Sequence, residues 1–188
     1  MPLLAVRGNG PASAYGFGAL SGKPGAMTAI ATSTVSSNIT SVTFSSIPGT
    51  YDDLRLVAYW KVNTGGGTLG VQFNSVTTTS YYFQIISGNG STAAANAGEA
   101  NALYVDSLNG AGTQPMIYTL DVIQYANTSN HKSVIMKMAS DANGSGLSNF
   151  ACGTWANSNA ITSIKLNLSD YNITSGSVFA LYGIKKAS

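Results

Sequence analysis

The sequence contains few of the residues that most often carry catalysis or bind metals. Its 188 residues include one cysteine, Cys152, and one histidine, His131. An internal disulfide, a cysteine zinc site and a cluster of histidine ligands are therefore excluded. A serine triad would require His131, which lies in a polar turn, and the chain has no G-x-S-x-G elbow. We expect no catalytic residue, no metal and no cofactor, and we interpret Cys152 as a small buried apolar side chain.

Charged residues are also scarce. They make up 9% of the chain, against about 25% in an average domain, and the net charge is +2. Because nucleic-acid binding needs a concentrated basic face, and the longest basic run is Lys185 with Lys186, we expect no nucleic-acid partner. The only adjacent acids, Asp52 and Asp53, are interpreted as solvated turn residues rather than calcium ligands. A carboxylate pair for glycoside cleavage would have to be assembled from distant positions, so a hydrolase is the weakest hypothesis.

Long hydrophobic runs are absent. No stretch approaches the roughly 18 apolar residues of a transmembrane helix, so we expect no membrane insertion. The short apolar stretch at residues 1–6 precedes Arg7, whereas a signal peptide carries its positive charge first. These features predict synthesis in a cytoplasm, with any export occurring as part of a particle.

The chain is instead rich in serine, threonine, asparagine and glycine, and its apolar residues recur in short segments. Ile164, Leu166 and Leu168 alternate with polar residues, which is the period-two pattern of a half-buried strand. Residues 178–184 are apolar at both parities, which predicts a central strand covered on both faces. Strands are predicted at residues 28–35, 39–44, 54–62, 68–73, 80–86, 103–108, 116–124, 132–138, 150–155, 164–168 and 178–184.

These segments predict an all-β domain, an antiparallel β-sandwich of jelly-roll type. Turn signals rich in glycine, proline and asparagine separate the strands. The polar turn at residues 36–38 is expected to join residues 28–35 and 39–44 as a hairpin. Residues 92–102 are rich in alanine but span only about three helical turns and contain Gly98. We interpret them as a long loop with at most one helical turn.

Residues 1–27 differ from the rest and are predicted to form an extended arm, with the β-sandwich knob at residues 28–188. Pro2, Pro11 and Pro24, together with several glycines, prevent a regular fold. One interpretation is a flexible tail. The other is an anchoring arm that becomes ordered when its large apolar side chains dock on a partner. Those side chains are Leu3, Leu4, Tyr15 and Phe17.

Sugar binding requires an exposed aromatic ring beside amides or carboxylates. Trp155, followed by Asn157 and Asn159, is the best candidate for a glycan contact. Aromatic residues in strands more often lie in the core, so burial of this ring is the competing interpretation. The other aromatic candidates are Trp60, Tyr81, Tyr82 and Tyr171.

Three segments carry a resemblance to a known family. The closing segment at residues 161–188 contains I-T-S-I-x-L, a polar turn and then S-x-F-A-L-Y-G-I-K. It resembles the closing hairpin of a β-sandwich domain found in surface proteins of tailed-bacteriophage virions. Two further pieces match in the same order, S-S-I-P-G-T-Y with its following strand at residues 45–60, and L-D-V-I-Q-Y-A-N-T at residues 120–128. Together they cover residues 28–188.

The resemblance implies a non-enzymatic structural protein on the surface of a phage particle. Its position would be either the tail, as a fibre or baseplate component, or the capsid, as a decoration protein. Other virion proteins would be its partners, and a homotrimer is implied because the resembling knobs are commonly trimers. The alternative is a carbohydrate-binding adhesin that recognises a host surface glycan.

Overall fold

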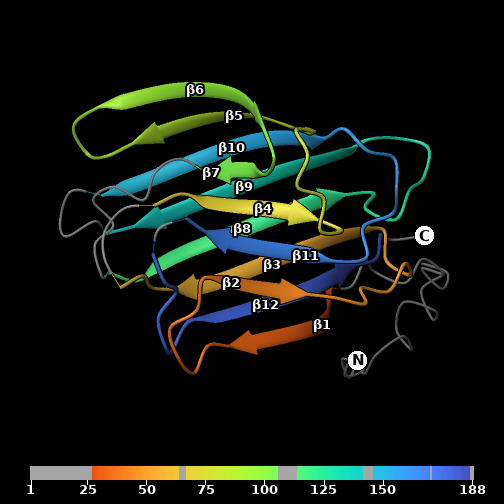
Figure 1. Cartoon of the computed structure of the whole chain (residues 1–188), viewed down its shortest axis with the longest axis horizontal. Coiled ribbons are helices and arrows are strands. Elements are labelled where there is room, and N and C mark those ends of the chain that lie inside the picture. The colour runs from red at the N-terminus through yellow and green to blue at the C-terminus, as the bar shows by residue number, and fades with distance from the viewer. Residues whose placement is uncertain (1–26, 64–66, 106–113, 142–145, 170, 187–188) are drawn as a thin grey trace, which may run out of the picture.

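The computed structural model describes residues 27–63, 67–105, 114–141, 146–169 and 171–186, and these form strands without any helix (Figure 1). Within these ranges there is accordingly no helix able to cross a membrane. The all-β prediction is confirmed. The strands are β1 (Met27–Thr34), β2 (Ser41–Phe44), β3 (Asp53–Trp60), β4 (Leu69–Phe73), β5 (Tyr81–Gly88), β6 (Ala93–Ala100), β7 (Leu103–Val105), β8 (Met116–Ile123), β9 (Lys132–Ser140), β10 (Leu147–Trp155), β11 (Ile164–Leu168) and β12 (Val178–Ile184).

Antiparallel pairing joins these strands into two sheets. The large sheet has eight strands in the order β1-β12-β3-β8-β9-β10-β5-β6, and the small sheet has four in the order β2-β11-β4-β7. Figure 1 shows the small sheet in front of the large one, so the two form a sandwich. Consecutive strands belong to different sheets at every step except β5 to β6, β8 to β9 and β9 to β10.

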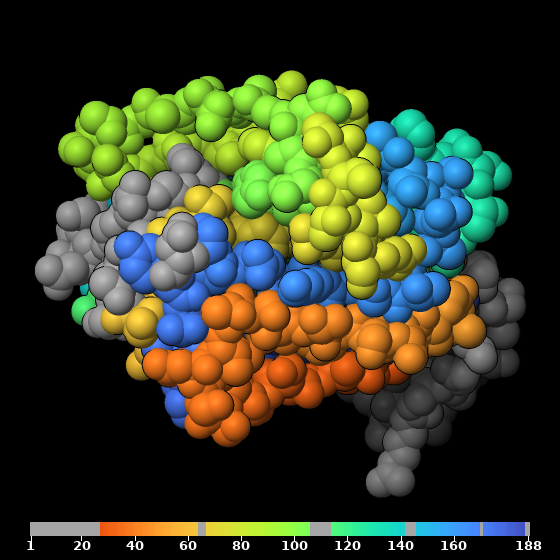
Figure 2. Space-filling model, in the orientation of Figure 1, coloured from red at the N-terminus to blue at the C-terminus, as the bar shows by residue number. Residues whose placement is uncertain are grey.

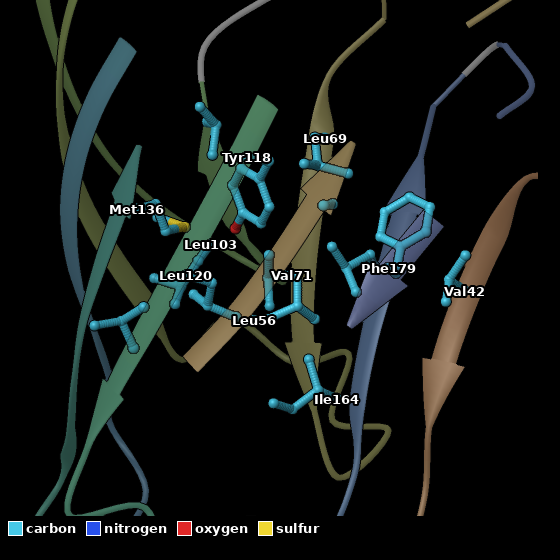
Figure 3. Close-up of a cluster of buried hydrophobic side chains, with 14 of the residues drawn as sticks. Val42, Leu56, Leu69, Val71, Leu103, Tyr118, Leu120, Met136, Ile164 and Phe179 are labelled. Atoms are coloured by element: carbon cyan, nitrogen blue, oxygen red, sulfur yellow. The ribbon is translucent and has the colours of Figure 1, made fainter. Parts of the chain in front are cut away.

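The core lies between the two sheets and follows the alternation of each strand. In β3, Leu54, Leu56 and Trp60 are buried, whereas Val57 and Tyr59 are exposed on the other side. Figure 3 shows side chains from both sheets meeting in this core, among them Val42, Leu69, Val71 and Ile164 from the small sheet and Leu56, Leu120, Met136 and Phe179 from the large one.

The hairpin β5–β6 widens the large sheet. β5 pairs with β10, and β6 pairs with β5 as the last strand of the sheet. Figure 2 shows β6, in green, as a ridge along the top of the molecule, beyond the strands of the small sheet. The large sheet is therefore considerably broader than the small sheet that covers it.

The interpretation of residues 92–102 as a loop is wrong, because residues 93–100 form β6. Eight consecutive residues of β6 pair in register with β5, from Ala93 opposite Gly88 to Ala100 opposite Tyr81. These backbone hydrogen bonds outweigh the helical preference of alanine. The ring of Phe83 packs over Gly98, where an added Cβ would lie 2.8 Å from the ring.

Two predicted hairpins are also wrong. β1 and β2 follow one another but lie in different sheets, and so do β11 and β12. β12 is the second strand from the edge of the large sheet, and one of its faces is only half-buried. Its apolar residues at both parities therefore do not reflect full coverage of both faces. Most other predicted strands agree with the structure to within about two residues at each end.

The three segments that carry the family resemblance contact one another. The Tyr125 hydroxyl donates to the Pro48 carbonyl and accepts from the Tyr51 N–H, at 3.4 Å from the nitrogen. The Tyr125 carbonyl accepts a hydrogen bond from the Ile161 N–H, with 2.9 Å between nitrogen and oxygen. The ring of Tyr51 lies on Gly183, where an added Cβ would fall 2.2 Å from a ring carbon. The role that the structure gives these motif residues is to hold the fold together.

Candidate interaction surface

The large sheet has one face against the small sheet and a second face, which we call the outer face, pointing away from it. Every second side chain of each strand contributes to the outer face. Strand register aligns these side chains in rows, with Tyr59 opposite Ile117 and Phe150 opposite Ile86. The central strands contribute Arg55, Val57 and Tyr59 from β3, Ile117, Thr119, Asp121 and Ile123 from β8, Ser133, Ile135, Lys137 and Ala139 from β9, and Ser148, Phe150, Cys152 and Thr154 from β10.

The outer face gathers the exposed large apolar side chains of the described residues. Among them, Ile86 is 63% exposed, Ile117 60% and Phe150 43%. Single exposed apolar residues are common on any protein, but a contiguous group on one face marks an interaction surface. The complete set is Met27, Val57, Tyr59, Tyr82, Ile86, Ile117, Ile123 and Phe150.

The corresponding surface of the small sheet is polar. Its outward positions include Thr43 on β2 and Lys165 and Asn167 on β11, while Gln72 on β4 is buried and bonds to the Asn101 carbonyl. None of the exposed large apolar residues belongs to a strand of this sheet, within the ranges that the structure describes. Among the described residues, the two sides of the sandwich therefore differ in chemistry, and the exposed large apolar side chains of the strands belong to the large sheet.

Charges on the outer face balance one another. Arg55 and Asp121 are cross-strand neighbours joined by two hydrogen bonds, Nε to Oδ1 at 2.6 Å and a guanidinium NH2 to Oδ2 at 3.0 Å. These bonds to Asp121 raise the pKa of Arg55. Glu99 lies opposite Tyr82, and the interaction with the Glu99 carboxylate raises the pKa of Tyr82. With Lys137 and Asp53, the outer strand positions carry two positive and three negative charges, and Lys186 pairs with Asp53.

Two hollows interrupt the outer face. The larger, about 580 Å³, lies over β6, β5, β10 and β9 and is lined by Tyr82, Gln84, Ser133, Cys152 and Thr154 among others. The smaller, about 340 Å³, lies over β3, β8 and β9 and is bordered by side chains that include Val57, Ile117 and Lys137. Both hollows are open to solvent. They are therefore better suited to protruding side chains of a partner protein than to a small molecule that must be enclosed.

Trp155 does not lie at the surface, so its prediction as a glycan contact is wrong. Its ring is fully buried and stacks on Tyr81, with centroids 6.2 Å apart. Trp155 is the last residue of β10 and points toward the small sheet, where Phe73 also contacts it. Asn157 and Asn159 lie in the following loop, where the Asn157 side chain accepts a hydrogen bond from the Asn159 N–H at 2.8 Å. A role of these two residues in glycan contact stays a prediction.

Cys152 is exposed, so its interpretation as a buried residue is wrong. It points to the outer face, between Ile135 on β9 and Gln84 on β5. The adjacent Ala151 takes the inward position. Position in the alternation of β10, and not the chemistry of the thiol, decides where Cys152 lies.

The adjacent acids Asp52 and Asp53 contact Lys186, which follows β12, instead of lying free in a turn. Asp53 is buried; its carboxylate accepts from the Gln124 N–H at 2.8 Å and lies 3.4 Å from Nζ of Lys186. Asp52 accepts from the Lys186 N–H at 2.8 Å. The solvated interpretation is therefore wrong for Asp53. No group of three potential metal ligands occurs among the described residues.

The proposed arm residues Leu3, Leu4, Tyr15 and Phe17 lie outside the described residues. Sequence reasoning also overlooked the outer face. The signal was present, because the predicted strands at residues 54–62 and 116–124 carry apolar side chains at both parities, as Val57, Tyr59 and Ile117 show. A strand with one face in the core and apolar residues on the other predicts a second contact.

Comparison with protein-family models, curated proteins and solved structures finds no match to this chain. The outer face is therefore the feature from which function is inferred. The outer face is broad, carries apolar side chains and has balanced charges. The centre of protein–protein interfaces is likewise poor in charge and rich in aromatic residues. This arrangement is suited to contact with another macromolecule.

Proposed function

We propose that this chain is a non-enzymatic structural protein of a tailed-phage virion, a surface knob attached through its N-terminal arm. The observation that supports this function best is the outer face, because a broad, apolar and charge-balanced sheet face is suited to packing between subunits. The phage setting comes from the sequence resemblance at residues 45–60, 120–128 and 161–188.

The strand order supports a jelly roll within this sandwich. In a jelly roll, eight strands form two antiparallel Greek keys that alternate between two sheets. Here four strands of the large sheet, β1-β12-β3-β8, and four strands of the small sheet, β2-β11-β4-β7, are arranged in this way. The additional strands β9, β10, β5 and β6 extend the large sheet. Jelly rolls are common in viral capsid proteins, in keeping with a role on a virion.

Attachment is assigned to the arm. Leu3, Leu4, Tyr15 and Phe17 provide apolar side chains for a binding groove on another virion protein. Proline and glycine let such a segment follow an irregular surface. The knob would be held at the tail or over the capsid, as the trimer that the resemblance implies.

Deletion of residues 1–26 in a phage that encodes this chain tests the proposal. We expect the shortened protein to keep its melting temperature, because β1 begins at Met27, and to be missing from purified particles. Mass spectrometry of particles then gives the copy number, which is low for a tail component and high for a capsid decoration protein. Normal incorporation of the shortened protein would rule out the arm as the anchor. Absence of the full-length protein from particles would refute the virion function.

A carbohydrate-binding adhesin is the second candidate, and the larger hollow favours it. Tyr82 is 46% exposed there and lies beside Gln84 and Thr154. An aromatic ring with an amide and a hydroxyl is the combination that binds sugars, and this hollow replaces Trp155 as the candidate site. Glycan-array binding that is lost in Tyr82→Ala and Gln84→Ala but kept in Thr43→Ala would support the adhesin. Absence of binding to any glycan would refute it.

A further inference from the structure

We infer that the outer face of the large sheet is the surface through which one copy of this chain packs against another copy. The inference does not depend on the phage setting. It rests on the size of the face, on the balance of its charges and on the polar character of the opposite side of the sandwich.

The size of the face is that of a stable subunit contact. Its eight strands, about 4.8 Å apart, span about 38 Å, and seven residues at about 3.4 Å each cover about 24 Å. The projected area is therefore roughly 900 Å², close to the about 800 Å² that each partner buries in an interface of standard size. The apolar side chains are spread over this area, from Tyr59 and Ile117 on β3 and β8 to Phe150 and Ile86 on β10 and β5.

The charges of the face complement a copy of the same face. Arg55 and Asp121 already neutralise each other through two hydrogen bonds, so they can be covered as a pair. Lys137 has no ion-pair partner among the described residues. Glu99, three strands away on β6, provides the opposite charge. Each copy carries both Lys137 and Glu99, so Lys137 of one copy can pair with Glu99 of another. A strongly acidic partner would repel Glu99, and a strongly basic partner would repel Lys137.

Register places Cys152 between Lys137 and Glu99 on the outer face. Lys137 pairs with Phe150, two residues from Cys152 along β10. Cys152 pairs with Gln84, and Glu99 pairs with Tyr82, two residues from Gln84 along β5. The midpoint between Lys137 and Glu99 therefore falls between Cys152 and Gln84. Because Cys152 is the only cysteine of the chain and is exposed in the single copy, its thiol reports whether the face is covered.

The first experiment measures the mass of the full-length protein by light scattering over a range of concentrations. We expect particles of two or more chains. Phe150→Asp would place a carboxylate in the contact and should raise the dissociation constant at least about a hundredfold. The matched control is Thr43→Asp, which puts the same charge at an exposed strand position on the small sheet and should leave the mass unchanged. A wild-type protein that stays monomeric at all concentrations would overturn the inference.

The second experiment follows the reaction of Cys152 with a thiol reagent in the same samples. The thiol should react roughly tenfold more slowly in the wild-type oligomer than in Phe150→Asp, because the partner covers it. An oligomer that leaves Cys152 fully reactive and that tolerates Phe150→Asp would use another surface, and the inference would be wrong.

Charge reversal tests the pairing itself and does not depend on Phe150. Lys137→Glu and Glu99→Lys should each weaken the oligomer, and the double variant should restore it, because it returns opposite charges to each side. Both positions are exposed, so folding should be retained, and melting curves check this. Single variants that leave the mass unchanged, or a double variant weaker than both, would contradict the proposed contact.

Discussion

Replacing Tyr118 by phenylalanine should stabilise the fold. Tyr118 lies on β8 with its ring in the core, and 1% of its surface is exposed. Its hydroxyl has no hydrogen-bond partner among the described residues. The ring therefore contributes packing, while the hydroxyl has lost its water without gaining a bond.

The size of the effect follows from that missing bond. A buried polar group without a partner costs about 1–3 kcal/mol. Tyr118→Phe removes the hydroxyl and keeps the ring, so the free energy of unfolding should rise by about 1 kcal/mol. For a domain of this size that corresponds to an increase of about 2–4 °C in melting temperature.

The gain should grow in alkaline solution. Burial raises the pKa of Tyr118, whereas in the unfolded chain a tyrosine ionises near pH 10. The contribution of the neutral phenol is fully present below about pH 10. Above it the unfolded state loses the proton first, and stability falls by about 1.4 kcal/mol per pH unit. Phenylalanine has no proton to lose, so Tyr118→Phe should exceed the wild type by more at pH 11 than at pH 8.

Urea unfolding of both proteins at these two pH values is the measurement, and Tyr125→Phe is the control. The Tyr125 hydroxyl bonds to the Pro48 carbonyl and the Tyr51 N–H, so its loss should destabilise by about 1–2 kcal/mol at pH 8. Equal destabilisation by Tyr118→Phe and Tyr125→Phe would refute the reasoning. So would a difference between wild type and Tyr118→Phe that does not change with pH.

Three further predictions concern the sandwich. Gly183→Ala should lower the free energy of unfolding by about 1–3 kcal/mol, because the new Cβ would displace the Tyr51 ring; an unchanged urea midpoint would show that the ring moves freely. In a double-mutant cycle with Arg55→Ala and Asp121→Ala, the coupling should be about 1 kcal/mol or less, because the side chain of Arg55 is 43% exposed, and a much larger coupling in urea unfolding would contradict this. Trp155→Ala should cost about 3–5 kcal/mol in thermal unfolding, and a melting temperature near that of the wild type would place Trp155 outside the core.

Local patterns predicted most of the strands because period-two alternation is a property of neighbouring residues. Ile164, Leu166 and Leu168 needed no partner to reveal a strand with one buried side. β6 was missed because its alanines and Gly98 carry little strand preference of their own. Pairing with β5 makes it a strand, and that partner cannot be found in the segment itself.

Residues on β10 show why the orientation of a strand was harder to predict than its presence. The polar Asn149 points inward and is 4% exposed, whereas the apolar Phe150 points outward and is 43% exposed. A hydrophobic pattern alone would reverse these two positions. Residue type alone likewise misplaced Cys152, and the neighbouring asparagines suggested a surface position for Trp155. Register with β9 and β5 sets the orientation of β10 instead.

The sequence by itself determined that the chain is all-β, with one cysteine, one histidine and apolar residues on both parities of its strands. These are properties of residue types and short-range order. Only the tertiary structure decided which strands pair, that β11 and β12 belong to opposite sheets, and that Trp155 is buried while Ile117 and Phe150 share one exposed face. The physical reason is that contacts in a sandwich join strands far apart in the chain, so the free energy that selects register and sheet depends on partners that no local segment contains.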